Sequence, residues 1–518
     1  MLVKMKWTLI LVTLFLNDVF SYKILVAFPY PGKSHSILGE GFVKHLLNGG
    51  HEVTYITPIP IKKPHPNLRQ IDVSSNFENF VFTNSLSFQK FLDNEVDFKD
   101  MHTMYRLMLT VAEKGVTHEN VQKFIMDPNE QFDLVIAEWL YQHLYSGFAT
   151  VFNCPYVWSS SMEPHPMVLG LIDEIGNPAY FADHMSPLTP PLSFSERVSE
   201  LWTVFYLYRI KWAVQDLEVE AYEKGFGPAV AKRGLRLPAF EEVKYNASAM
   251  FGNSHVSLGE AHRVPLNYVP IAGYHINEQT QPLPENLQKI MDNAPNGVIY
   301  FSMGTMMPSK TMPMELKRAF LDMFSSLKYT VIWKLEEEFK DIPKNVHVVQ
   351  WAPQPSILAH PNCKLFISHG GLLSTTETVH YGVPIIGVPL FADQFINVLR
   401  AIRKGFALQV DLGFDTPAKL KVAIGEILGD PKYTNKVKEL SYIYHNRINK
   451  PGDEINWWVK HVIETRGAVH LRSPALHVPI YQKLYLDLIA LVLLVLVVVI
   501  RMLKKLISGK NETKQKKH

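Results

Sequence analysis

A strand, a glycine turn and a helix follow one another between residues 363 and 382, and this pattern constrains the fold more than any other part of the sequence. Residues 363–367 form a mostly apolar run, which predicts a buried strand. The run leads to His369-Gly370-Gly371, where the missing side chains let an anionic ligand approach the backbone. Free amide groups at the start of the following helix point toward the same place. The pattern therefore predicts an α/β fold that binds a diphosphate-like anion.

Polar residues beyond the glycine turn are spaced to meet the rest of such a ligand. Glu377 lies about one helical turn after Ser374, so both side chains can face one ligand, and the carboxylate suits ribose hydroxyls. Residues 383–388 make another short apolar run, which brings Asp393 and Gln394 to the carboxyl end of a strand. Ligands of open α/β sheets bind at that edge. A carboxylate beside a carboxamide suits the hydroxyls of a hexose.

Strand and helix patterns recur on both sides of a polar, proline-containing stretch. The expected strands are at residues 23–28, 51–57, 132–137, 155–159, from 298 onward, 330–334, 346–350, 364–368 and 383–388. A helix is expected after the first strand, because Leu38, Phe42 and Leu46 fall on one face. This opening is a βαβ unit, so the sheets are expected to be parallel.

The length and composition are compatible with two domains of this kind. The chain has 518 residues, of which 47% are hydrophobic and 19% charged, enough for two cores. We expect a first domain at 22–276, which the resemblance described below implies is the acceptor-binding domain, a linker at 277–296 and a second domain, which binds the anionic ligand, at 297–472. Residues 193–222 form an aromatic helical region, for which core packing is favoured over a cavity wall or contact with a membrane surface.

Both ends of the chain carry apolar segments. Residues 1–21 have two lysines, a short apolar core and small residues near position 21, which predicts a secretory signal peptide, with an uncleaved anchor as the alternative. Residues 484–503 are long and apolar enough for a transmembrane helix, and a buried soluble helix is the alternative. Lysines follow at once in the tail 504–518, so the positive-inside rule predicts a cytosolic tail and a luminal body.

Charge and cysteine usage narrow the partners and the compartment. Seven Lys or Arg and one Glu lie between residues 501 and 518, so the rest of the chain has a net charge of −3 and no nucleic-acid partner is expected. Lys514 and Lys516 have the spacing of a dilysine retrieval signal of the endoplasmic reticulum, although a solvated tail would look the same. Asn246 begins a glycosylation sequon. The two cysteines provide no disulfide framework.

The stretch from Phe366 to Gln394 resembles the signature of the UDP-glycosyltransferases, the family of animal UDP-glucuronosyltransferases and insect UDP-glucosyltransferases. Family-like sequences recur at residues 297–305, 351–354 and 467–472, so the resemblance covers nearly the whole chain. It implies the GT-B fold, in which two Rossmann-like domains face each other across a cleft. It also implies an enzyme that uses a UDP-sugar as donor substrate and a small lipophilic molecule as acceptor.

His35 and Glu138 are the expected catalytic residues. His35 lies just beyond the first predicted strand, where an imidazole can reach a cleft and accept a proton near neutral pH. The resemblance implies that it is the general base. Relatives orient this base with an aspartate, and the matching position here is Glu138, one methylene longer. The extra methylene shifts the carboxylate by more than roughly 1 Å, and a misplacement of that order is costly in catalysis.

The resemblance also assigns the donor site. Trp351 is expected to stack on uracil, Gln354 to reach the ribose, and Ser302 and Thr305 to contact phosphate. The remaining donor-binding residues are His369, placed to neutralise the diphosphate as UDP leaves, and Gly371, Ser374, Glu377, Asp393 and Gln394. Leu373 stands where many vertebrate relatives have asparagine. No cofactor and no metal site are expected, since the sequence has no Asp-x-Asp and helix amides with a histidine can replace a cation.

These inferences predict inverting transfer of a hexose from a UDP-sugar to a lipophilic hydroxyl compound, with glucose favoured and glucuronic acid as the alternative. The protein is expected in the membrane of the endoplasmic reticulum as a single-pass type I protein, and it could form homo-oligomers. Two alternatives remain open at this point. One is a sugar-nucleotide or lipophile-binding protein with weakened activity, because Glu138 replaces aspartate; the other is a transferase that acts on membrane lipid.

Overall fold

The computed structural model describes residues 21–63, 65–78, 88–93, 100–305 and 309–515. The chain divides into two compact units, residues 1–472 and 473–518, which are described separately. The predicted signal peptide at 1–21 lies outside the described residues except for residue 21. Lys516, one of the two lysines of the predicted retrieval signal, also lies outside them.

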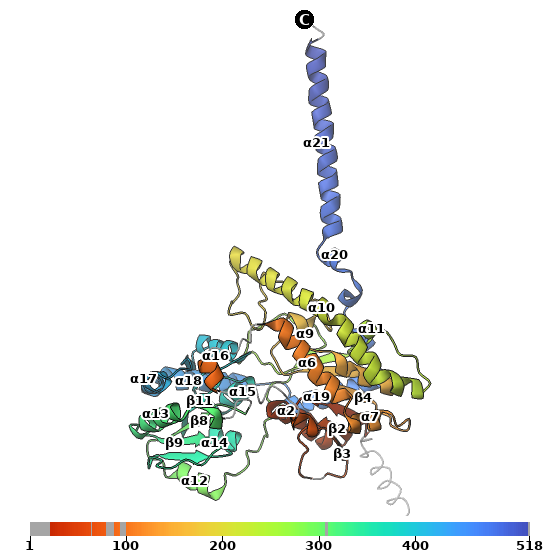
Figure 1. The fold of residues 1–518 in the computed structure, drawn as a ribbon. Helices are drawn as coiled ribbons and strands as arrows, with labels where there is room; N and C mark the ends of the chain where they lie inside the picture. Colours follow the sequence, from red (N-terminus) through yellow and green to blue (C-terminus); the bar gives the residue numbers. More distant parts are fainter. Residues whose placement is uncertain (1–20, 64, 79–87, 94–99, 306–308, 516–518) are drawn as a thin grey trace, which may run out of the picture. The chain divides into compact units, whose positions relative to one another are not determined.

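The first half of the large unit, in which Figure 1 labels β2, β3 and β4, is built on a parallel sheet in the order β3-β2-β1-β4-β5-β6-β7. Its strands are β1 (Lys23–Ala27), β2 (Glu52–Thr57), β3 (Leu68–Asp72), β4 (Leu134–Trp139), β5 (Tyr156–Ser160), β6 (Ala249–Gly252) and β7 (Tyr268–Pro270). The central strands are buried on both faces, as expected of parallel strands covered by helices. Residue Ala27 of β1 pairs with Ala137 of β4, so these two strands end side by side.

Helices cover this sheet and connect its strands. They are α2 (Lys33–Asn48), α3 (Ser75–Glu78), α5 (Phe88–Leu92), α6 (Met101–Val116), α7 (Glu119–Ile125), η1 (Leu144–Ser146), α8 (Gly147–Phe152), α9 (Pro166–Leu169), α10 (Phe194–Lys232) and α11 (Phe240–Lys244). In α2, Leu38, Phe42 and Leu46 are buried, as their spacing predicts. The helix begins directly after β1 and a short turn, which places its first residues at the carboxyl edge of the sheet.

The long helix α10 differs from the expectation of core packing for the aromatic region. Its first half exposes Phe194, Trp202, Phe205 and Trp212, each more than half exposed. The prediction was wrong for these residues because their spacing places them on one outward stripe. The apolar residues of the opposite stripe, such as Leu207 and Ile210, are buried.

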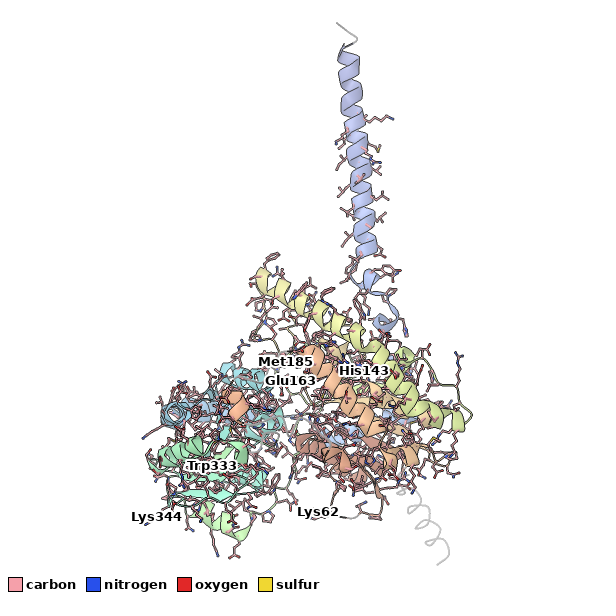
Figure 2. The ribbon with its side chains drawn as sticks, viewed as in Figure 1. Lys62, His143, Glu163, Met185, Trp333 and Lys344 are labelled. Carbon is pink, nitrogen blue, oxygen red and sulfur yellow. The ribbon has the colours of Figure 1, made fainter. Side chains whose placement is uncertain are left out.

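The second half contains a parallel sheet in the order β10-β9-β8-β11-β12-β13. Its strands are β8 (Val298–Ser302), β9 (Thr330–Lys334), β10 (Val346–Val349), β11 (Cys363–Ser368), β12 (Ile385–Gly387) and β13 (Ala407–Gln409). The associated helices are α12 (Glu285–Asp292), η2 (Ser309–Thr311), α13 (Met314–Ser325), α14 (Gln354–Ala359), α15 (Leu372–Tyr381), α16 (Gln394–Arg403), α17 (Thr416–Gly429), α18 (Pro431–His445) and α19 (Pro451–Glu464), followed by η3 (Val469–Leu471). Trp333 of β9, labelled in Figure 2, is buried in the hydrophobic core that packs against this sheet.

The last helix of the large unit returns to the first core. In α19, Ile455, Val459 and Val462 pack in the cluster that contains Ile24 and Phe42. The predicted domain at 297–472 includes this helix, although its apolar face covers the other sheet. Two separate chain segments therefore stabilise the first half.

The second unit contains η4 (Pro474–His477), α20 (Ile480–Lys483) and α21 (Leu486–Gln515). Within it, residues 486–506 of α21 are long and apolar enough to cross a membrane, with a mean hydropathy of 2.9. The predicted span was 484–503, so the apolar span begins two residues later and ends three residues later, and α21 itself continues to Gln515. Tyr485 has a positive φ of 55°, which breaks the helical conformation between α20 and α21.

Candidate active site

A cavity of about 380 Å³ lies in the large unit, and residues of both sheets line it. His35 and all predicted donor-binding residues are in its wall: Ser302, Thr305, Trp351, Gln354, His369, Gly371, Ser374, Glu377, Asp393 and Gln394. These residues come from the carboxyl ends of strands, from the loops that follow them and from the first two turns of helices. The fold thus brings together residues that are more than 350 positions apart in the sequence.

His35 and Glu138 form a pair beside this cavity. His35 belongs to the first turn of α2, and Glu138 lies in β4, one residue beyond the last pair of the β1–β4 ladder. The Nδ1 atom of His35 is hydrogen-bonded to Oε1 of Glu138, which is completely buried. Among the residues that the structure describes, Oε2 of Glu138 has no hydrogen-bond partner. Because Nδ1 is engaged, Nε2 is the ring nitrogen left to accept a proton from a bound substrate.

Gln354, Ser374 and Glu377 form a second polar group in the wall. The Nε2 atom of Gln354 donates to Oγ of Ser374 at 3.0 Å and to Oε2 of Glu377 at 2.7 Å. Burial raises the pKa of the Glu377 carboxyl to about 7, and the hydrogen bond from Gln354 opposes this rise. The carboxyl therefore changes its ionisation near neutral pH, and hydroxyl donors from a ligand would favour its charged form.

The ring of His369 packs against the backbone of two glycines, Gly304 and Gly371. A methyl group on Gly304 would come within 2.7 Å of its ring, and one on Gly371 would come within 2.6 Å of its Nε2 atom. Gly304 also has a positive φ of 79°, which favours glycine. Burial, with a smaller effect of Lys334, lowers the pKa of His369 to about 4. In the protein alone the imidazole is therefore neutral at pH 7, and it can offer a hydrogen bond to a ligand rather than a permanent charge.

Asp393 and Gln394 are held by the loop that precedes α16. Oε1 of Gln394 accepts hydrogen bonds from the amides of Leu390 and Phe391, at 2.9 and 3.2 Å. Oδ2 of Asp393 accepts from Nδ2 of Asn397 at 2.8 Å. One oxygen of each side chain thus positions the loop, and the remaining polar atoms are those that can meet a ligand.

Comparisons with known proteins identify the family to which this arrangement belongs. The family model described as "UDP-glucoronosyl and UDP-glucosyl transferase" matches residues 23–517. UDP-glucosyltransferase 2 of Dactylopius coccus is 34% identical over 473 residues, which cover 91% of this chain and 90% of that protein. UDP-glucuronosyltransferase 2B15 of Rattus norvegicus is 26% identical, with coverage of 89% and 88%. The chain belongs to the UDP-glycosyltransferase family.

Solved structures agree with this assignment at the level of the fold. The glycosyltransferase VinC in complex with dTDP superposes with a TM-score of 0.55 at 14% identity, covering 86% of this chain and all of VinC. A UDP-glucosyltransferase from Polygonum tinctorium also gives a TM-score of 0.55, at 16% identity, and the coverage is 86% and 99%. The predicted GT-B fold and the predicted enzyme class, a UDP-glycosyltransferase, are confirmed.

Two lysines lie near the predicted donor-binding residues, and sequence analysis did not assign either of them to the site. Nζ of Lys334, at the end of β9, donates to the carbonyl of Gly304 at 2.8 Å and also pairs with Glu336. Nζ of Lys33, from the start of α2, lies 3.2 Å from the centre of the Trp351 ring. Trp351 is 54% exposed, and the ammonium of Lys33 covers one face of its ring. Lys334 is the last residue of the strand predicted at 330–334, and this position at the carboxyl edge of the sheet was the sequence signal that could have assigned it to the site.

The other end of the cavity is apolar and rich in methionine. Its wall includes Met101, Met104, Met108, Met162, Met185, Leu140 and Tyr141. Met185 is labelled in Figure 2. Methionine side chains are flexible and adapt to irregular apolar ligands. This end of the cavity suits a lipophilic molecule.

The predicted glycosylation sequon lies away from the cavity wall. Asn246 is exposed, and its carbonyl accepts a hydrogen bond from Arg472 at 3.2 Å. The hydroxyl of Ser248, the third residue of the sequon, is buried and donates to the carbonyl of Gly467 at 2.9 Å. Modification of Asn246 would therefore have to precede packing of residues 467–472, and glycosylation stays a prediction.

Ionisation of Glu377 predicts a pH dependence of donor binding. Since ribose hydroxyls would donate to the carboxylate, the ionised form binds better, and the Kd for UDP-glucose is expected to fall about five- to tenfold between pH 6 and pH 8. UDP-glucose has no group that titrates in this range. Isothermal titration calorimetry at several pH values measures the effect. Glu377→Gln should bind UDP-glucose without this fall in Kd, and identical pH profiles of the two proteins would contradict the assignment.

Proposed function

We propose that this transferase moves a hexose, glucose in preference to glucuronic acid, from a UDP-sugar to the hydroxyl of a small lipophilic acceptor, with inversion at the anomeric carbon. The observation that carries the proposal is the hydrogen bond between His35 and the buried Glu138, beside a cavity whose other walls hold the donor residues. A base, a donor site and an apolar acceptor site therefore share one space.

The proposed reaction is a single displacement. The acceptor oxygen attacks the anomeric carbon and forms the new glycosidic bond, while the bond from that carbon to the diphosphate oxygen breaks. The hydroxyl proton passes to Nε2 of His35, and the electron pair of the broken bond leaves with UDP. Glu138 stabilises the resulting imidazolium through Nδ1. One base suffices because UDP is a good leaving group.

The second half of the large unit, which carries the donor-binding residues, positions the UDP-sugar and stabilises the charge that develops on UDP as it leaves. Amide groups at the start of α15, which opens at Leu372, face the cavity beside His369. The neutral His369 can donate a hydrogen bond to a phosphate oxygen, and an approaching diphosphate would raise its pKa toward protonation. Lys334, which bonds the carbonyl of Gly304 and pairs with Glu336, is the charged neighbour of His369. We propose that these groups serve the departing UDP without a metal ion.

The preference for glucose is supported by similarity. UDP-glucosyltransferase 2 of Dactylopius coccus is 34% identical to this chain, whereas UDP-glucuronosyltransferases 2B15 and 2B7 of Rattus norvegicus and Homo sapiens are 26% and 25% identical. Incubation of the purified protein with UDP-glucose or UDP-glucuronate and a panel of phenols and sterols, read by mass spectrometry, tests the donor and the acceptor class. Products with glucuronate alone, or none, would contradict the proposal.

We further propose that α21 anchors the protein in the membrane of the endoplasmic reticulum, with residues 22–472 in the lumen. Support comes from the apolar span at 486–506 and the lysines that follow it. Proteinase treatment of sealed microsomes should leave the large unit intact and remove only the tail after the span. Detergent-permeabilised microsomes are the control, and digestion of the large unit in sealed vesicles would refute this orientation.

A further inference from the structure

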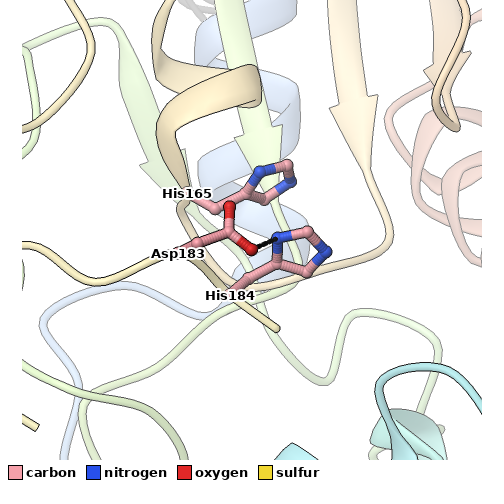
Figure 3. A group of neighbouring side chains, drawn as sticks. All are labelled: His165, Asp183 and His184. Carbon is pink, nitrogen blue, oxygen red and sulfur yellow. Dashed lines mark ion pairs between the residues drawn. The ribbon is translucent and has the colours of Figure 1, made fainter. Parts of the chain in front are cut away.

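His165, Asp183 and His184 form a buried group that the proposed reaction does not use (Figure 3). His165 precedes α9, and the other two residues lie in the segment between α9 and α10. Each residue offers one ligand atom, and these atoms lie within 4.8 Å of one another. All three residues are at most 4% exposed. Such a concentration of potential ligands in a core requires an explanation.

Several polar atoms of this group lack partners in the part of the chain that the structure describes. Neither ring nitrogen of His165 has a hydrogen bond, and Oδ2 of Asp183 has none. Nδ1 of His184 lies 3.3 Å from Oδ1 of Asp183 and makes no hydrogen bond. Buried polar atoms without partners destabilise a fold, and here they gather around one point. A bound cation at that point would satisfy them together.

The neighbours of the group hold it in an orientation suited to such an ion. Nε2 of His184 lies 2.6 Å from the hydroxyl of Tyr141, which leaves Nδ1 for a metal. Oδ1 of Asp183 accepts from the amide of Met185 at 2.9 Å, which leaves Oδ2. The amide of Asp183 donates to the buried Glu200 at 2.8 Å. Outer contacts of this kind fix the ring orientation and the tautomer of metal ligands.

We propose that His165, Asp183 and His184 bind one divalent transition-metal ion of the zinc class. Two imidazoles and one carboxylate form a ligand set that zinc accepts, whereas calcium and magnesium prefer oxygen ligands alone. Zinc holds each ligand atom at about 2.0–2.2 Å, so binding would draw the three groups together by about 1 Å. The competing description is a metal-free pair of neighbouring imidazoles, whose ring centres lie 4.0 Å apart, beside Asp183.

The position of the group gives the ion a structural role at the acceptor end of the cavity. Met162 and Met185 line the cavity and lie within three residues of the ligands, and Tyr141 lines it as well. The ion would join the segment after β5 to the segment before α10. This role rests on the proposed function, and it predicts that metal removal raises the KM for a phenol acceptor several-fold while the KM for UDP-glucose stays within about twofold.

Metal uptake by the full-length protein in detergent tests the site independently of turnover. The protein is stripped with EDTA, desalted, loaded with Zn²⁺ and freed of excess ion, and its zinc content is measured by mass spectrometry. We expect one equivalent in the unsubstituted protein and less than about 0.2 in His165→Gln, Asp183→Asn and His184→Gln. The matched control is the double variant His461→Gln/His470→Gln. It removes an exposed pair of imidazoles whose Nε2 atoms lie 3.2 Å apart, and it should keep one full equivalent of zinc.

Two results would overturn the site: less than about 0.2 equivalents of zinc in the unsubstituted protein, or loss of the zinc in the surface double variant. If the core variants do not fold, X-ray absorption of zinc in the surface double variant decides. A spectrum that shows two imidazoles and one carboxylate as the protein ligands of zinc supports the site, and a spectrum that shows any other set of protein ligands contradicts it. An acceptor KM that does not respond to zinc would refute the structural role alone. Absence of turnover would contradict the proposed function and leave the uptake measurement valid.

Discussion

His35→Ala is expected to lower kcat by about 10²- to 10⁴-fold, the range that general-base catalysis contributes. His35 lines the cavity and is paired with a buried carboxylate, so the substitution removes the proton acceptor and leaves the donor walls in place. Binding of UDP should therefore change little. Initial rates with a phenol acceptor, together with calorimetry for UDP, measure both quantities. His65→Ala, which removes an exposed imidazole, is the matched control.

The double variant His35→Ala/Glu138→Ala reports whether the two residues act as a unit. Because Glu138 is proposed to act through the imidazole, its removal should add little to the loss already caused by His35→Ala. Glu138→Asp restores the residue of the relatives but withdraws the carboxylate from Nδ1, so its activity tests whether the site fits the longer side chain. Full activity of His35→Ala, or strictly additive losses, would refute this mechanism.

Gly371→Ala is expected to raise the Kd for UDP and to lower kcat/KM by about 10- to 100-fold, since misplacement of a site residue by 1 Å can cost 10²-fold. The new methyl group would lie 2.6 Å from Nε2 of His369, so the ring has to move. The backbone of Gly371 has a φ of −61°, which alanine adopts freely, so steric displacement of the ring is the only cause. Calorimetry and steady-state kinetics measure the effect.

Gly425→Ala provides the control for that substitution. Gly425 lies inside α17, and nothing lies within 4 Å of the methyl group that the substitution would add. It should leave UDP binding unchanged and stabilise the helix by about 0.5–1 kcal/mol. If Gly371→Ala binds UDP as tightly as the unsubstituted protein, the glycine turn has no role in binding the diphosphate.

The donor half was predictable because its signals are local. Residues 363–382 contain an apolar run, a glycine turn and a helix stop, and they form β11 and α15 as expected. The resemblance to the UDP-glycosyltransferases supplied His35 and Glu138 as expected catalytic residues, and their roles stay a prediction. Their proximity follows from the fold, because the parallel strands β1 and β4 pair side by side up to Ala27 and Ala137.

The features that sequence analysis missed depend on tertiary structure. Lys334 ended a predicted strand, but only the fold shows that its ammonium reaches the carbonyl of Gly304. The methionines of the acceptor end come from α6 and from two segments before α10, and no local pattern joins them. The apolar face of α19 was visible in the spacing of Ile455, Val459 and Val462, but spacing does not say which sheet a helix covers.

The anomeric configuration of the product tests the central claim of a single displacement most directly. UDP-glucose, an α-linked donor, is incubated with the full-length protein and a phenol, and the first product formed is examined by NMR. A single displacement with His35 as base requires a β-glucoside. An α-glucoside would contradict the account, because retention requires either two displacements through a covalent intermediate or attack from the side of the leaving group.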